Sequence, residues 1–295
     1  MLYPRQQTTL ANTLTVSGRG FWTGVLNTLT MRPAEAGEGI QFVRADLDGK
    51  PRAKATCESS QGIALRTQLQ HGAATFEMIE HVMSALYGMG IDNAVVESTA
   101  AEMPGFDGSS HLLSLAIQNA GAVGLSQPRP MLVVDEVIQI GDAERFIRVE
   151  PRSAEQTAEL EVVYELDFGS ESPIKACRFH GVVTPENYSE SIAPARTFIS
   201  QADATALQQS GVAQHVTERD LLVFGPNGPI NNELRFANEC ARHKALDVIG
   251  DLALAGCNLI GRVVARRSGH QLNGEMANVL RDKHLKQQKG SLMAA

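Results

Sequence analysis

The stretch from Arg242 to Leu252 constrains the fold most, because it combines an apolar helical pattern with several charged side chains. Leu246, Ile249 and Ala253 recur at the spacing of one helix face, which predicts a helix with a buried stripe. Burying charged groups beside such a stripe is costly unless they are paired or bind a metal ion. The stretch therefore needs partners from another part of the chain, unless its polar face is solvated.

The polar face of this helix has the spacing of a metal site. His243, Asp247 and Asp251 are four residues apart, so in a helix of 3.6 residues per turn they project from one side. An imidazole and a carboxylate at this spacing can bind one metal ion, while the next carboxylate could orient another group. The alternative is a solvated face with a salt link to Arg242 or Lys244.

Composition and charge exclude several classes of protein. The chain has 295 residues, enough for one large or two medium domains, and its net charge of −7 argues against a nucleic-acid partner. No signal peptide opens the sequence and no apolar stretch is long enough for a transmembrane helix, so we expect a cytoplasmic protein. The four scattered cysteines form no CxxC pair and are expected to be reduced thiols.

The two halves of the chain repeat one order of elements: strands, a helix, a glycine, a strand, a turn and a second helix. In the first half we predict strands within 13–31 and at 40–44, 63–69 and 94–98, and helices at 76–87 and 109–119. In the second we predict a strand meander at 131–139, 146–151 and 158–167, a helix start at 184–186, a helix ending near 254, a strand at 259–265 and a helix from 273.

This repeated order predicts an α+β fold of two topologically similar domains, each a sheet with two helices on one face. Their bounds are residues 1–125 and 131–295, and the proline-containing residues 126–130 form the linker. If the two helical layers pack on each other, the first long helix of each half lies at the interface.

Glu80 and His81 occupy the place in the first half that His243 occupies in the second. A lone histidine on a helix is more often a surface or hydrogen-bonded residue than a ligand. If the helical layers face each other, however, His81, His243 and Asp247 meet, and two histidines and an aspartate with an open fourth position are typical of catalytic zinc. Such a zinc lowers the pKa of its bound water to about 7, and Glu80 would stand beside that water as a general base.

Three further polar residues have both a functional and an ordinary interpretation. Asp251 could orient the ring of His270 and keep it protonated, and this ring would then stabilise an oxyanion or protonate a leaving amine. The alternative is that His270 caps a helix or faces solvent. Thr197 could donate its hydroxyl to an oxyanion or be an ordinary turn residue. Lys244 could contact a phosphate or be a surface lysine.

Several motifs occur in the order of a known family, over nearly all of residues 1 to 285. They are Ile79-Glu80-His81, Gly88-x-Gly90-Ile91-Asp92-Asn93, Phe106-Asp107-Gly108-Ser109, Ala195-Arg196-Thr197-Phe198, the stretch from Arg242 to Leu252, and Ser268-Gly269-His270-x-Leu272-Asn273. With them the chain resembles the UDP-3-O-acyl-N-acetylglucosamine deacetylases, the zinc amidases of bacterial lipid A synthesis. The resemblance implies two β-α-α-β sandwich domains, with the active site between their helical layers.

The resemblance also implies the reaction and the residues that perform it. The implied reaction is hydrolysis of the N-acetyl amide of UDP-3-O-acyl-N-acetylglucosamine to the free amine and acetate, and we expect a monomer. The implied roles are zinc ligation by His81, His243 and Asp247, general-base catalysis by Glu80, protonation of the leaving amine by His270 with Asp251 as its partner, oxyanion stabilisation by Thr197, and substrate contacts by Phe198 and Lys244.

The sequence departs from the family at the substrate pocket. Trp22 stands where the family usually has a histidine, Met78-Ile79 replace its Thr-Val, and residues 211–224 carry charged and polar side chains in place of glycines and apolar groups beside the acyl chain. Either this segment turns its charged side chains to solvent, or the acyl channel is shortened or closed, and we predict the second. The alternatives are a zinc deacylase for a different N-acetylated sugar nucleotide and a non-catalytic binding protein, although binding alone needs no general base.

Overall fold

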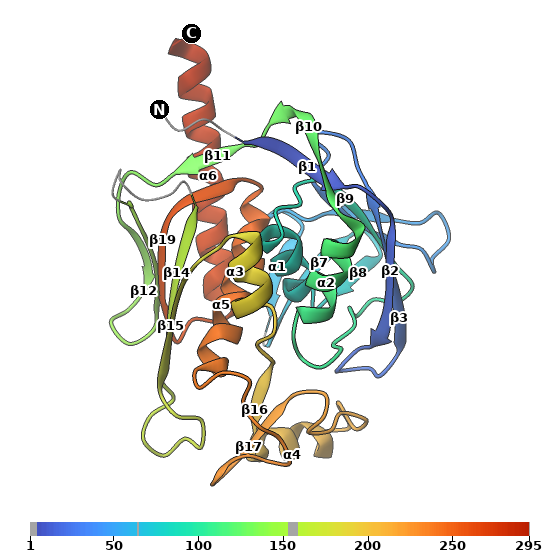
Figure 1. Cartoon of the computed structure of the whole chain (residues 1–295), viewed down its shortest axis with the longest axis vertical. Helices are drawn as coiled ribbons and strands as arrows, with labels where there is room; N and C mark the ends of the chain where they lie inside the picture. The colour runs from blue at the N-terminus through green and yellow to red at the C-terminus, as the bar shows by residue number, and fades with distance from the viewer. Residues whose placement is uncertain (1–4, 64, 153–158, 295) are drawn as a thin grey trace.

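The computed structural model describes residues 5–63, 65–152 and 159–294, and most of its helices lie between two large β-sheets (Figure 1). The first sheet has the strand order β2-β3-β9-β4-β5. These strands are β2 (Leu14–Arg19), β3 (Leu26–Pro33), β9 (Ala94–Ser98), β4 (Ile40–Arg44) and β5 (Arg52–Lys54). Helices α1 (Glu80–Gly88) and α2 (His111–Ala120) lie on its inner side.

The second sheet has the order β12-β13-β19-β14-β15, and β11 also pairs with β19. Its strands are β11 (Met131–Val133), β12 (Ile138–Gly141), β13 (Phe146–Glu150), β19 (Asn258–Arg266), β14 (Leu160–Leu166) and β15 (Cys177–Val182). Helices α5 (Glu239–Leu252) and α6 (His270–Ala294) lie between this sheet and α1 (Figure 1). The 3₁₀ turn η2 (Ala253–Ala255) and Gly256, in a left-handed conformation, end α5 as predicted.

Both sheets follow the same topology, and the predicted α+β class is confirmed. In each of these two sheets the strand that comes last in the chain lies in the middle: β9 is antiparallel to β3 and parallel to β4, and β19 is antiparallel to β13 and parallel to β14. The predicted meander over 131–167 is therefore wrong, because β19 separates β13 from β14. The side chains of β19 are almost all buried, as a central strand covered by helices requires.

The hairpin that precedes α1 differs from the prediction. The single strand predicted at 63–69 is two strands, β6 (Ser60–Ile63) and β7 (Arg66–His71), and residue 64 lies outside the described residues. Strand β8 (Ala74–Glu77) follows and contains the first residues of the helix predicted from residue 76. That helix begins only at Glu80, because Met78 has a φ of 57°, which no right-handed helix allows.

Other element boundaries also differ from the prediction. Residues 126–128 of the predicted linker are the end of β10 (Ala122–Pro128), which pairs with β1 (Gln6–Leu10). Helix α6 begins at His270, before the predicted Asn273. The helix start predicted at 184–186 is present, because the Thr184 side chain caps α3 (Pro185–Asn187) and a π-helical turn, η1 (Tyr188–Ile192), continues it. Residue 158, in the strand predicted at 158–167, lies outside the described residues.

A small sheet projects from the end of the molecule (Figure 1). It consists of β16 (Phe198–Ser200), β17 (Leu222–Gly225) and β18 (Gly228–Pro229), with the exposed helix α4 (Gln201–Gln209) beside it. Across the described residues, no helix has the length and apolar character needed to cross a membrane. All four cysteines are free thiols, as the sequence predicts.

Candidate metal centre and catalytic site

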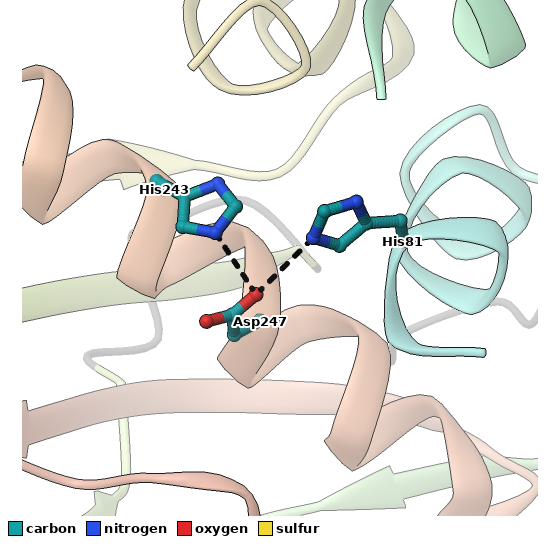
Figure 2. Close-up of side chains that lie close together, drawn as sticks. All are labelled: His81, His243 and Asp247. Atoms are coloured by element: carbon teal, nitrogen blue, oxygen red, sulfur yellow. Dashed lines mark ion pairs between the residues drawn. The ribbon is translucent and has the colours of Figure 1, made fainter. Parts of the chain in front are cut away.

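The site forms where α1 crosses α5. A Cβ at Gly250 would overlap the main-chain oxygen of Glu80, so glycine is required for the two helices to approach this closely. The crossing places the start of α1, with Glu80 and His81, against the face of α5 that carries His243 and Asp247 (Figure 2). Side chains from the two halves of the chain therefore meet as the helix pattern predicts.

His81, His243 and Asp247 form a cluster that could hold a metal ion. Asp247 Oδ1 lies 3.8 Å from His81 Nε2 and 3.6 Å from His243 Nε2, and the three ligand atoms lie within 4.8 Å of one another (Figure 2). All three residues are buried, and Asp247 Oδ1 has no hydrogen-bond partner among the described residues. An unpaired buried carboxylate oxygen is costly, so its position between two imidazole nitrogens fits a cation, and this donor set fits zinc.

The two histidines are in the protonation state that binds a metal. His243 Nδ1 lies 3.2 Å from the main-chain oxygen of Ala195, so Nδ1–H donates to that oxygen and Nε2 keeps its lone pair. Burial lowers the pKa of His243. Burial, together with the neighbouring His243, also lowers the pKa of His81 to about 3. Both rings are therefore neutral near pH 7, as metal ligation requires.

Asp247 is held as a carboxylate by its neighbours. Its Oδ2 accepts a hydrogen bond of 2.7 Å from Lys244 Nζ. Burial favours the neutral acid, but Lys244 and the surrounding histidines outweigh it and lower the pKa of Asp247. Lys244, which the resemblance implies to be a substrate contact, thus also keeps Asp247 of the candidate metal site ionised.

Glu80 is a buried carboxylate with the properties of a general base. Its Oε2 accepts a hydrogen bond of 2.9 Å from the main-chain N–H of Thr67. Burial raises the pKa of Glu80 to about 7; His270 opposes this rise, and the charges of Asp251 and Asp247 add to it. A pKa near the working pH is the value at which a general base is most effective.

His270 and Asp251 form a buried pair beside the cluster. His270 Nδ1 lies 3.0 Å from Asp251 Oδ2, which also accepts a hydrogen bond of 2.8 Å from Asn273 Nδ2. Burial disfavours the charged ring, but Asp251 outweighs it and the pKa of His270 is raised to about 9. His270 is thus an imidazolium near pH 7, with its Nε2 4.0 Å from Asp247 Oδ2. It can donate a proton at the site.

Thr197 lies beside the metal cluster. Its hydroxyl oxygen is 3.2 Å from His243 Nε2 and donates to the Gly108 oxygen at 3.0 Å. Gly108 has a φ of 86°, and its main-chain oxygen also accepts from the Thr197 N–H, which explains the glycine in that motif. The ring of Phe198 contacts His243 edge to face at 6.0 Å between centroids.

A buried ion pair fixes the segment that carries Thr197 and Ala195. Arg196 Nε donates to Glu239 Oε1 at 2.8 Å, and Arg196 Nη1 donates to Asn232 Oδ1. The Arg196 main-chain N–H also donates to Glu239. Because both residues of the pair are buried, the pair holds the segment in one geometry against the start of α5.

Sequence reasoning missed two residues that hold the candidate catalytic groups. Asn273 stood in a recognised motif, and its hydrogen bond to Asp251 could have been anticipated there. Thr67 lies in strand β7, outside every motif, and donates to both Glu80 and Asp251. Nothing in the sequence around residue 67 signals this role, because the contacts depend on how β7 meets two helices.

The comparisons with known proteins agree with this geometry. The family model for LpxC, UDP-3-O-acyl N-acetylglycosamine deacetylase, matches residues 7–282. A UDP-3-O-acyl-N-acetylglucosamine deacetylase of Thermosynechococcus vestitus is 37% identical over 279 residues, which cover 93% of each chain. Deacetylases of the same name from Geobacter sp. strain M21 and Xanthomonas euvesicatoria are 38% and 33% identical, with 93% of this chain and 88% and 90% of theirs covered.

Proposed function

The chain belongs to the LpxC family of UDP-3-O-acyl-N-acetylglycosamine deacetylases, and we propose that its buried cluster hydrolyses the N-acetyl amide of UDP-3-O-acyl-N-acetylglucosamine. It is a zinc-dependent amidohydrolase of lipid A biosynthesis. The observation that carries this function is the unpaired Asp247 Oδ1, which faces two neutral imidazole nitrogens in a buried site.

In this proposal the ligands hold the zinc and the surrounding side chains move protons. His81, His243 and Asp247 are the zinc ligands. When bound, zinc would polarise the acetyl carbonyl and lower the pKa of a nearby water molecule. Glu80 takes a proton from the attacking water as the water oxygen bonds to the carbonyl carbon. The Thr197 hydroxyl, next to His243 Nε2, would turn from the Gly108 oxygen to donate a hydrogen bond to the developing oxyanion.

His270 completes the reaction. Its imidazolium gives a proton to the amide nitrogen as the carbon–nitrogen bond breaks, and acetate and the free amine leave. Asp251 holds the ring in position and keeps it charged. Phe198 and Lys244 are the proposed substrate contacts, because Phe198 lies against His243 and Lys244 against Asp247.

The chain's setting in the cell follows from its composition. The free cysteines support a reducing compartment, and we propose the cytoplasm. The net charge of −7 argues against a nucleic-acid partner. Because one chain supplies both helices of the site, we propose that it acts as a monomer.

We also propose that residues 1–125 and 131–295 are two domains joined at 126–130. The identical strand order of the two sheets supports this division. The site would then lie at the domain interface, where α1 and α5 pack on each other.

The acyl-chain pocket is proposed to be short. His215 Nε2 donates to the Gly20 oxygen at 2.8 Å, and the Ala213 N–H donates to the Trp22 oxygen at 3.4 Å. These contacts bring residues 211–216 onto the 20–24 loop. The Arg66 guanidinium in turn lies over the ring of Trp22, with its Cζ 4.6 Å from the ring centroid. A polar segment packed on this loop leaves less apolar surface for an acyl chain.

Acetate release from a panel of substrates tests the proposed function. The panel should contain UDP-N-acetylglucosamine and related N-acetyl sugar nucleotides, each with and without a 3-O-acyl chain. We expect zinc-dependent acetate release from the 3-O-acylated glucosamine nucleotide. Release only from another sugar nucleotide would contradict the proposed substrate, and no release from any member by the zinc-loaded protein would contradict the enzyme itself.

A further inference from the structure

Thr67 occupies a position where a strand would otherwise have an unpaired main-chain group. Strands β7 and β8 pair from Gln68 and Glu77 onward, and the positive φ of Met78 ends β8 before it can pair with Thr67. The Thr67 oxygen accepts instead from the Ile79 N–H at 3.3 Å, and the Thr67 N–H donates to Glu80 Oε2 at 2.9 Å. The end of the hairpin is thus fastened to the start of α1.

The side chain of Thr67 reaches the other helix. Its hydroxyl donates to Asp251 Oδ1 at 2.6 Å, while Asp251 Oδ2 accepts from His270 and Asn273. Only 3% of Thr67 is exposed, so bulk water does not compete for these bonds. Both bonds go to carboxylates, and hydrogen bonds to charged groups are the stronger class.

We propose that Thr67 is a positioning residue for deacetylation, fixing the carboxylate of the base and the carboxylate that holds the acid at the same time. The inference rests on the proposed function, in which Glu80 takes a proton from the attacking water and His270 gives one to the leaving amine. The two donors of Thr67 are separated only by its Cα and Cβ, and a β-branched side chain has few rotamers. One rigid residue therefore sets Glu80 relative to Asp251.

A purely structural role gives a different expectation. If Thr67 only satisfied buried polar groups, its loss would lower stability and leave turnover of the folded enzyme intact. A positioning role instead lowers kcat and leaves KM unchanged, because Thr67 does not touch the substrate. The two roles are separable in variants that remove only the hydroxyl.

Thr67→Val removes the hydroxyl and keeps the shape and the main-chain N–H. With zinc content matched to the wild type, we expect kcat to fall about tenfold to a hundredfold, the usual range for partners behind catalytic ligands, with KM within about twofold. Thr67→Ser, which restores the hydroxyl, should recover most of kcat, and Thr67→Ala should resemble Thr67→Val. Thr75→Val in neighbouring β8 is the matched control and should behave as the wild type.

A second measurement reads the contact without turnover. The proton on His270 Nδ1, hydrogen-bonded to Asp251, should give a downfield proton NMR signal, and at fixed pH Thr67→Val should shift it while Thr75→Val should not. Activity should also show that Thr67 acts through Asp251: the double variant Thr67→Val with Asp251→Asn should be about as slow as Asp251→Asn alone.

Unchanged kcat in both Thr67→Val and Thr67→Ala would overturn the proposal, as would fully additive losses in the double variant. If Thr67→Val or Thr67→Ala fails to fold, the turnover of Thr67→Ser and the NMR signal of the variant that does fold decide between a positioning role and a purely structural one. A wild-type protein that releases no acetate would refute the proposed function, whereas the NMR comparison would still report whether Thr67 holds the His270–Asp251 pair.

Discussion

Burial acts on every ionisable group in the site, and the neighbours of each group decide the outcome. Burial raises the pKa of Glu80 to about 7, because the nearby charge of His270 only partly offsets it. His270 is buried to a similar degree, but Asp251 outweighs burial and raises its pKa to about 9. At neutral pH the site therefore combines a carboxylate that can take a proton with an imidazolium that can give one.

These opposite shifts predict a bell-shaped dependence of kcat/KM on pH. The rate should rise as Glu80 loses its proton, and because a bound cation lowers the pKa of that carboxyl, this limb should lie below about pH 7. It should fall as His270 loses its proton, near pH 9. A pH profile with saturating zinc measures both limbs.

Two variants assign the limbs. His270→Gln should remove the alkaline limb, and Glu80→Gln should bind zinc normally yet lose about a hundredfold or more in kcat, the scale of general-base contributions. Near-native turnover in Glu80→Gln would mean that another group is the base, and an alkaline limb that persists in His270→Gln would mean that His270 is not the acid.

Local spacing was sufficient to point to His243 and Asp247 as candidate metal ligands, but not to the residues that hold the site in place. Residues four positions apart lie on the same face of any α-helix, so the sequence alone places the side chains of His243 and Asp247 on one face. The two donors of Thr67, by contrast, depend on where β8 stops, and that depends on the positive φ of Met78. No periodicity in the sequence predicts such a residue.

The crossing of α1 and α5 sets the distance between the ligands of the two helices. It relies on Gly250, which lets the backbone of α1 lie directly on α5. The same crossing places Glu80, at the first turn of α1, next to the metal cluster. The sequence predicted both helices from their apolar stripes, but the start of α1 was placed too early, because Phe76 continues the apolar period although it belongs to β8.

Gly250→Ala should therefore damage the site without touching a ligand. The added methyl group meets the Glu80 oxygen, so α1 must shift, at a cost to the free energy of unfolding of about 1–3 kcal/mol. We expect at least about tenfold weaker zinc binding or turnover. Denaturant unfolding and zinc titration measure the two effects.

Gly274→Ala is the control for helix propensity. Gly274 also lies in a helix, but a Cβ there would meet nothing within 4 Å, so the change should be neutral or stabilising by up to about 1 kcal/mol. Equal effects of the two substitutions would show that the crossing tolerates a larger residue.

The whole molecule brings the site together from two similarly built halves. His81 comes from the helix under the first sheet, and His243 and Asp247 come from the helix under the second (Figure 1). The repeated order of elements predicted this pairing. It did not predict the central place of β9 and β19, because strand order within a sheet depends on contacts between residues far apart in the chain.

Selectivity for the acyl chain is a property of the surfaces around the site. A full apolar channel gains about 0.8 kcal/mol for each buried methylene, hence hundreds-fold or more in affinity over several methylenes. With residues 211–216 packed on the 20–24 loop, we expect kcat/KM to change by less than about tenfold as the 3-O-acyl chain grows from about four to about fourteen carbons. A steep, continuous gain with chain length would show that the channel is open.

Zinc content of the purified protein tests most directly whether the two helices build one metal site. The wild-type protein should bind about one zinc per chain, because three buried donors converge on one position. His81→Ala, His243→Ala and Asp247→Ala should each lose most of it, whereas Lys175→Ala, at an exposed position outside the cluster, should not. Full retention of zinc in all three ligand variants would contradict the account.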